Sequence, residues 1–296
     1  MLDCLAEARV RTTWCIISPG YDRSVMARIE AEGHEAAFHY NALDTQGGKW
    51  DEAEFLSQLN LVRETLRTAE PIRTNKNHYL RWEGYSEFYE WCERAGIKVE
   101  QSRGGTKQGN KGFLSGTCHP FLPVSQGGKA CNRLFPIYNL PTLAWDPPLP
   151  LRCTMTEARM ILNRSLDVHG VAHFLFHPTL IERNPEVKPA LLELIGYGRE
   201  KGLAWWTSEQ ICSWLEVRRD VSVRLQKDKL VIYAVHAHDA VTLLLNSPVT
   251  GLYPEGSART VRRFGHTLVE LTIALPEGET VIHLQRQSAG QPRQHA

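Results

Sequence analysis

Three histidines stand where apolar segments of the chain give way to polar ones, a placement that suits metal binding or proton transfer. His39 and His177 each end an apolar run, and His78 follows a third. Asp44 lies five residues beyond His39. Imidazole nitrogens and carboxylate oxygens are common ligands of zinc, and imidazole exchanges protons near neutral pH. These residue types predict a reactive site if the fold gathers them, whereas a hydrogen-bonded structural histidine is the alternative at His39.

A second group of polar and aromatic side chains follows the apolar residues 72–75. Side chains that combine hydrogen bonding with stacking suit a sugar-like ligand, although the same cluster could simply begin a helix. Farther on, the segment from Arg103 to Lys107 could hold an anionic group or serve as a flexible connector. The candidate substrate-binding residues are Asn77, Arg81, Trp82, Arg103 and His119.

The elements that must position these residues alternate between strand and helix through the first 219 residues. This alternation favours a mainly parallel α/β domain, and the number of units favours a barrel over an open sheet. The expected strands are residues 12–18, 35–40, 72–75, 97–101, 135–138, 143–145 and 172–176; the expected helices are residues 24–32, 50–68, 85–95, 155–168 and 187–201, with one more strand and helix after Gly202. Active sites of such barrels lie at the carboxyl ends of the strands.

The pattern changes after Arg219 to short β-rich runs that no helix interrupts. We expect a small β-sandwich-like module over residues 220–286 and a disordered tail over residues 287–296. The expected strands are residues 221–225, 230–236, 240–245, 268–274 and 280–284. The module could serve interaction or oligomerisation. Its His236-x-His238-Asp239 sequence permits a metal site, but a solvated strand or loop is the plainer interpretation.

Composition narrows the class of protein. The 296 residues carry a formal net charge of +1, with 42% hydrophobic and 23% charged residues, which is typical of a soluble globular protein. The balanced charge gives no reason to expect nucleic acid or a membrane as partner. Seven cysteines without CxxC spacing predict separate thiols in a reducing compartment. With no secretory leader pattern, we expect a cytoplasmic protein, and the sequence leaves the oligomeric state open.

Residues 33–39, Gly-His-Glu-Ala-Ala-Phe-His, resemble the Gly-His-Glu-apolar-x-x-His segment of NodB-type polysaccharide deacetylases. Residues 11–17 resemble the second strand of that family, residues 172–178 its late strand ending in a functional histidine, and residues 191–218 its closing helix, strand and helix. The resemblance covers about residues 1 to 219. The segments of residues 75–84 and 101–120 are similar to a divergent branch of the same superfamily, in which His119 matches a loop-borne histidine.

The resemblance implies a distorted parallel (β/α) barrel and a metal-dependent hydrolase of non-peptide C–N bonds that deacetylates an N-acyl saccharide or related compound. Family members bind a divalent metal ion, here expected to be zinc, through one Asp and two His, with an Asp as general base and a late His as general acid. His39 matches the first metal-binding His and His177 the general acid.

Two departures from the family's pattern leave alternatives open. Leu43 occupies the position of the second metal-binding His, and the chain starts at the helix that should follow the first strand, where the family's two Asp residues lie. The metal site could be rebuilt from His39, His78 and Asp44. The missing strand could instead reflect a coding start placed too late or a fragment. The chain could also be a non-catalytic saccharide-binding protein that keeps the mouth of the barrel.

Overall fold

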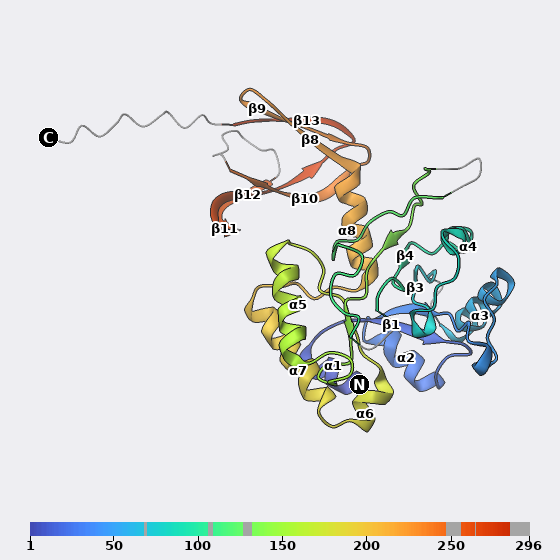
Figure 1. The fold of residues 1–296 in the computed structure, drawn as a ribbon. Coiled ribbons are helices and arrows are strands. Elements are labelled where there is room, and N and C mark those ends of the chain that lie inside the picture. The colour runs from blue at the N-terminus through green and yellow to red at the C-terminus, as the bar shows by residue number, and fades with distance from the viewer. Residues whose placement is uncertain (68–69, 106–108, 127–131, 247–255, 264, 285–296) are drawn as a thin grey trace. The chain divides into compact units, whose positions relative to one another are not determined.

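A computed structural model describes residues 1–67, 70–105, 109–126, 132–246, 256–263 and 265–284 (Figure 1). The chain divides into two compact units, Met1–Cys212 and Ser213–Ala296, and the division falls inside the helix α8 (Ser208–Asp220). The domain boundary expected after residue 219 stays a prediction, and the tail expected beyond residue 286 lies outside the described residues.

The N-terminal unit is built on a parallel sheet of five strands in the order β1-β2-β3-β4-β5. The pairing of β1 with β2 runs in register from Thr13–Glu35 to Ile17–His39. A parallel ladder places the carboxyl ends of neighbouring strands at the same edge of the sheet. The strands are β1 (Thr13–Ile17), β2 (Glu35–His39), β3 (Thr74–Asn75), β4 (Val99–Glu100) and β5 (Tyr138–Asn139).

Two further strands of this unit, β6 (Ala144–Trp145) and β7 (Phe174–Leu175), form a separate parallel pair. An isolated parallel bridge joins Gly104 to Thr142 between β4 and this pair. The mixed α/β fold with a parallel sheet is therefore confirmed, while closure of the barrel stays a prediction.

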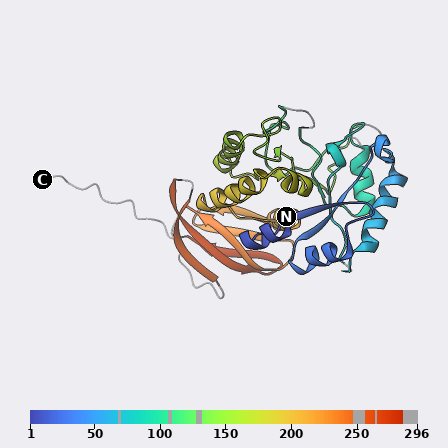
Figure 2. The same cartoon turned by 90° about the horizontal axis from the view of Figure 1, so that it is seen from below.

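Eight α-helices are found among the described residues, and those of the N-terminal unit lie around its strands (Figure 2). Their starts follow local rules: the side chain of Asp51 accepts a hydrogen bond from the Glu54 amide, and Thr154 forms a capping box with Glu157. The helices are α1 (Leu2–Ala8), α2 (Arg23–Ala31), α3 (Glu52–Thr65), α4 (Glu87–Ala95), α5 (Met155–Asp167), α6 (Pro178–Arg183), α7 (Val187–Glu200) and α8; two 3₁₀ turns are η1 (Asp44–Gln46) and η2 (His78–Leu80).

The strand expected after Gly202 is wrong, because residues 203–206 carry no strand. Thr207 and Gln210 exchange side-chain and backbone hydrogen bonds that start α8 directly after this segment. The side chain of Trp205 still packs against the main hydrophobic core, although its backbone pairs with no strand. The short helix α6 was not expected, although Pro178 at its first turn is typical of a helix start.

Buried aromatic side chains form a core around the carboxyl end of β2. Tyr40, Phe38, Phe55 and Phe88 are fully buried, and the rings of Tyr40 and Phe88 are stacked with centroids 6.1 Å apart. Burial of each such side chain contributes on the order of 2 kcal/mol to folding. Since Phe38 and Tyr40 flank His39, the core holds the backbone of that histidine in place.

The C-terminal unit contains two three-stranded antiparallel sheets, ordered β10-β12-β11 and β13-β9-β8, which contribute to one hydrophobic cluster. Strand β11 was not expected, because its Gly-Ser-Ala-Arg-Thr-Val-Arg-Arg sequence lacks apolar alternation and its side chains are mostly exposed. The strands are β8 (Val221–Gln226), β9 (Lys229–Ala234), β10 (His238–Leu245), β11 (Gly256–Arg263), β12 (His266–Leu275) and β13 (Gly278–His283). Over the described residues, no helix is both long and apolar enough to cross a membrane.

Candidate functional site

His39 and His78 meet at the carboxyl ends of β2 and β3. The Nε2 atom of His39 lies 3.0 Å from Nδ1 of His78, and Nδ1 of His39 lies 2.7 Å from the carbonyl oxygen of Lys76. Because a carbonyl can only accept, Nδ1 of His39 carries the proton and Nε2 presents its lone pair towards His78. Nδ1 of His78 therefore donates the proton between the two rings. A histidine oriented through Nδ1 by a backbone carbonyl is typical of metal ligation.

Both histidines are held in the neutral form. Burial, followed by the charge of His78, lowers the pKa of His39 to about 3. Burial, followed by the charge of His177, lowers the pKa of His78 below its ordinary value. Neutral imidazole is the form that binds metal ions.

His177 forms the second half of the site together with Asp146, which sequence reasoning missed. Asp146 accepts hydrogen bonds from the backbone N–H and from Nδ1 of His177, each at 2.7 Å, and it forms an ion pair with Arg152. Its side chain is fully buried and its backbone lies in the left-handed region at φ 47°. A strained, buried carboxylate that orients a histidine is typical of functional sites.

Two signals could have led to Asp146 from the sequence. It directly follows the short strand β6, and it precedes two prolines, Pro147 and Pro148. The same rule that singled out His39, a polar residue at the end of an apolar run, applies here as well. Tyr79 was also missed: it is 60% exposed, has φ 56°, and its ring centroid lies 4.7 Å from that of His78.

Nε2 of His39 and Nδ1 of His78 could both bind one divalent cation only with the proton of His78 moved to its Nε2. Catalytic zinc sites use three protein ligands. Across the described part of the chain, no cluster of three or more His, Cys, Asp or Glu side chains is arranged to hold a metal ion. Asp44, expected as a ligand, lies in η1 with a 78% exposed side chain, 3.8 Å from a guanidinium nitrogen of Arg81. The structure therefore brings His39 and His78 together, whereas Asp44 contacts Arg81.

Four of the expected substrate-binding residues lie in two loops that touch. The Asn77 backbone N–H donates to the Ser102 hydroxyl at 2.8 Å, and the Asn77 amide donates to the Arg81 carbonyl at 2.9 Å. The guanidinium of Arg103 lies over the ring of Trp82, 3.8 Å from its centroid. The loops after β3 and β4 thus form one continuous wall beside His78.

His119 lies apart from this wall. Its Nε2 atom is 2.9 Å from the carbonyl oxygen of Val168, and its backbone N–H donates to the Thr117 hydroxyl. The side chain is exposed and contacts none of the other predicted site residues through a hydrogen bond. The segment expected to hold an anion is described only as far as Gly105, so Lys107 lies outside the described residues.

A buried polar cluster lies among the strands next to these histidines. The ammonium of Lys76, which is 2% exposed, lies 3.2 Å from Nε2 of His173, whose Nδ1 is 3.1 Å from the Pro141 carbonyl oxygen. Burial lowers the pKa of Lys76 and raises that of Glu100 to about 7. So many buried ionisable groups cost stability, which indicates that they serve a site rather than the fold.

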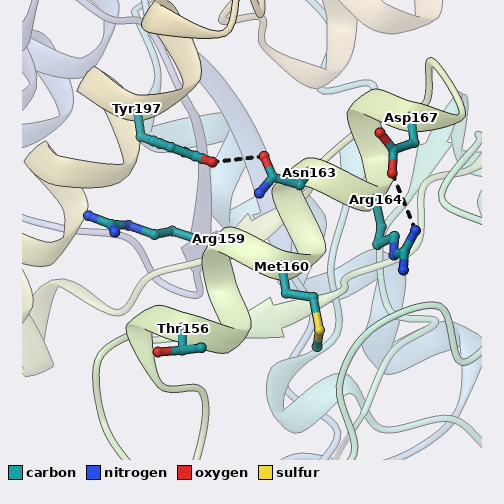
Figure 3. Close-up of a pocket in the computed structure, with 7 residues that line it drawn as sticks. All are labelled: Thr156, Arg159, Met160, Asn163, Arg164, Asp167 and Tyr197. Carbon is teal, nitrogen blue, oxygen red and sulfur yellow. Dashed lines mark hydrogen bonds and ion pairs between the residues drawn. The ribbon is translucent and has the colours of Figure 1, made fainter.

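A surface pocket of about 440 Å³ lies elsewhere on the unit, between α5 and α7 (Figure 3). Its arginines are already engaged: Arg159 pairs with Glu193 and Arg164 with Asp167. None of the predicted site residues lines it.

Comparison with solved structures identifies the fold. A candidate polysaccharide deacetylase from Mycobacterium smegmatis superposes with a TM-score of 0.54 at 18% identity, covering 76% of this chain and 79% of that one. A candidate polysaccharide deacetylase involved in O-antigen biosynthesis, from Bordetella bronchiseptica, gives a TM-score of 0.39 at 13% identity over 66% and 75% of the two chains. Agd3, a carbohydrate deacetylase, gives 0.37 at 10% identity over 78% and 41%. No protein-family model and no curated protein matches.

The first of these likenesses shows that the chain has a polysaccharide-deacetylase-like fold, so the resemblance noted from residues 33–39 is confirmed at the level of the fold.

Proposed function

We propose that this chain is a carbohydrate deacetylase-like hydrolase that cleaves the C–N bond of an N-acyl saccharide, with His39 and His78 as ligands of a divalent metal ion, zinc by expectation. One observation carries the proposal: His39 and His78 face each other with nitrogens 3.0 Å apart, and His177, whose Nδ1 is held by Asp146, lies near enough to interact with both electrostatically. Imidazoles for metal binding and an oriented imidazole for proton transfer are the two kinds of group that amide hydrolysis needs.

The residues of the chain have distinct roles in this reaction. Asp146 holds Nδ1 of His177 and stabilises the ring when it is protonated, which leaves Nε2 to donate a proton to the leaving nitrogen. As the C–N bond breaks, water supplies the hydroxyl of the released acid and the amine keeps the proton. When bound, the metal ion would polarise the acyl carbonyl and acidify a water molecule.

A second function, saccharide binding without hydrolysis, is favoured by Leu43, which replaces a metal-binding His of the family's pattern. The loop wall of Trp82 and Arg103 would serve such a protein equally well. In that case saccharide affinity would be the same with and without a chelator.

Elemental analysis of the purified chain separates the two functions. We expect about one divalent ion per chain in the wild type and in His119→Ala, and its loss in His39→Ala and His78→Ala. His119→Ala is the matched control because it removes an imidazole outside the pair. Absence of metal from the wild type, together with chelator-independent saccharide binding, would establish the non-catalytic function instead.

A further inference from the structure

A pocket of about 320 Å³ lies beside the loops that follow β3 and β4, and the proposed hydrolysis assigns it no role. Its walls include the rings of Tyr85, Tyr89 and Phe121, together with Arg103 and Gln126. This volume falls at the lower end of the range for small-molecule sites. The ring of Tyr85 belongs to a residue that is 74% exposed, so its face is open to a ligand. Aromatic rings combined with a few polar groups suit one saccharide unit.

The charge of this pocket is positive. Arg103 is the single charged side chain among its described lining residues, and within the described part of the chain no carboxylate lies within ion-pair distance of its guanidinium. Glu100 lies near enough to interact with Arg103 electrostatically, but its carboxyl group receives hydrogen bonds from the Ser102 backbone and hydroxyl. Burial raises the pKa of Glu100 to about 7, so this group balances the guanidinium only in part.

The guanidinium is held in an orientation that suits an anion. It lies over the ring of Trp82 at 3.8 Å, and one of its nitrogens makes a long hydrogen bond of 3.4 Å to the Tyr85 carbonyl. The guanidinium also has a hydrogen-bonding contact with the side chain of Tyr89, and its remaining N–H groups match the two oxygens of a carboxylate or phosphate.

The pocket is joined to the reactive histidines through the backbone. The hydrogen bond from the Asn77 N–H to the Ser102 hydroxyl, 2.8 Å long, links the residue before His78 to the residue before Arg103. A ligand in the pocket therefore lies next to the loop that carries His78.

We propose that this pocket binds an anionic saccharide unit, carrying a carboxylate or a phosphate ester, adjacent to the unit that is deacylated. The identification of the ligand as a saccharide rests on the proposed function, whereas the positive charge of the pocket is independent of it. The protein would then prefer acidic polysaccharides over neutral ones.

Calorimetric titration of the full-length chain with three probes tests this inference without any turnover: methyl glucuronide, glucose 6-phosphate and the neutral methyl glucoside. We expect at least one anionic probe to bind about tenfold or more tightly than the glucoside, and the tighter of the two anions identifies the preferred group. Arg103→Gln should abolish this preference. Arg159→Gln, which removes a guanidinium stacked on Tyr197 in another pocket, should leave it unchanged.

Should Arg103→Gln fail to fold, Tyr85→Ala replaces an exposed ring and should weaken all three probes. Equal affinity for the anionic and neutral probes, or a preference that survives Arg103→Gln, would overturn the inference. Because binding is measured without hydrolysis, an inactive protein that still prefers anions would refute the proposed function alone. An active deacetylase without that preference would refute the pocket alone.

Discussion

Histidines gather near a carboxylate in both units of the molecule, but in different surroundings. In the C-terminal unit, Asp220 lies between His236 and His238, with contacts of 2.6 Å to each ring. In the N-terminal unit, Asp146 is fully buried and contacts one histidine, His177, together with Arg152. The side chain of His236 is 77% exposed, so its pairing with Asp220 competes with water. Proximity of histidine and aspartate alone therefore does not mark a reactive site, and we propose one only where the carboxylate is buried and further imidazoles lie near.

The two carboxylates, Asp220 and Asp146, also differ in the groups around them. Burial raises the pKa of Asp220, but hydrogen bonds from His236 and His238 outweigh burial and lower this pKa to about 2. Both oxygens of Asp220 are engaged in these bonds. His177 likewise has Nδ1 bound to a carboxylate and no hydrogen bond at Nε2 among the described residues, but its carboxylate is fully buried and it interacts electrostatically with His39 and His78. We propose proton transfer only for this second cluster.

The largest expected effect concerns His177. We expect His177→Ala to reduce kcat for deacetylation by about 10²- to 10⁴-fold, because a general acid contributes a factor of this size. His238→Ala, which removes a carboxylate-bound histidine from the other unit, should keep wild-type activity. Steady-state kinetics of both variants checks the contrast, and equal losses would refute the distinction between the clusters.

Loss of the buried carboxylate should reduce stability strongly. Asp146→Ala leaves Arg152 and His177 without their partner, and we expect the free energy of unfolding to fall by about 3 kcal/mol. Urea denaturation measures this change. Glu193→Ala is the control, since it breaks the exposed pair with Arg159 and should change stability by about 0.5 kcal/mol. A similar small loss for Asp146→Ala would mean that this carboxylate is not an anchor of the site.

The smallest effect is expected at Asp220, and it depends on pH. Because the pKa of Asp220 is lowered in the folded state, its stabilising contribution is present above its unfolded pKa and is lost as the pH falls towards about 2. Asp220→Asn should therefore lower the melting temperature at pH 7 by a few degrees at most, and the difference should shrink as the solution is acidified. Thermal melts of both proteins across this pH range check the sign. A difference that grows on acidification would contradict the pairing.

The sequence revealed His39, His78 and His177 because each follows an apolar run, and parallel strands bring such positions to one edge. Asp146 was missed although it also ends an apolar run, because the strand before it has only two residues and prolines follow it. The role of Asp44 as a metal ligand stays a prediction. The distance of Asp44 along the chain from His39 is short, but the turn of η1 leaves Asp44 exposed beside Arg81.

The buried pairing of Lys76 with His173 depends on a contact between residues 97 positions apart in the chain. Local patterns do not encode such contacts. The fold was nevertheless predictable from helix and strand alternation, since the amphipathic helices and buried strands repeat the same signals along the whole N-terminal unit.

Acetate release from an N-acetylated chito-oligosaccharide, measured for the wild type before and after treatment with a chelator and after zinc is restored, tests the proposed hydrolysis most directly. We predict release by the untreated protein, loss with the chelator, recovery with zinc, and no recovery in His39→Ala. No acetate release by a folded, zinc-loaded wild-type chain from N-acetylated saccharides, neutral or acidic, would contradict the assignment of the His39–His78 and Asp146–His177 pairs to deacetylation.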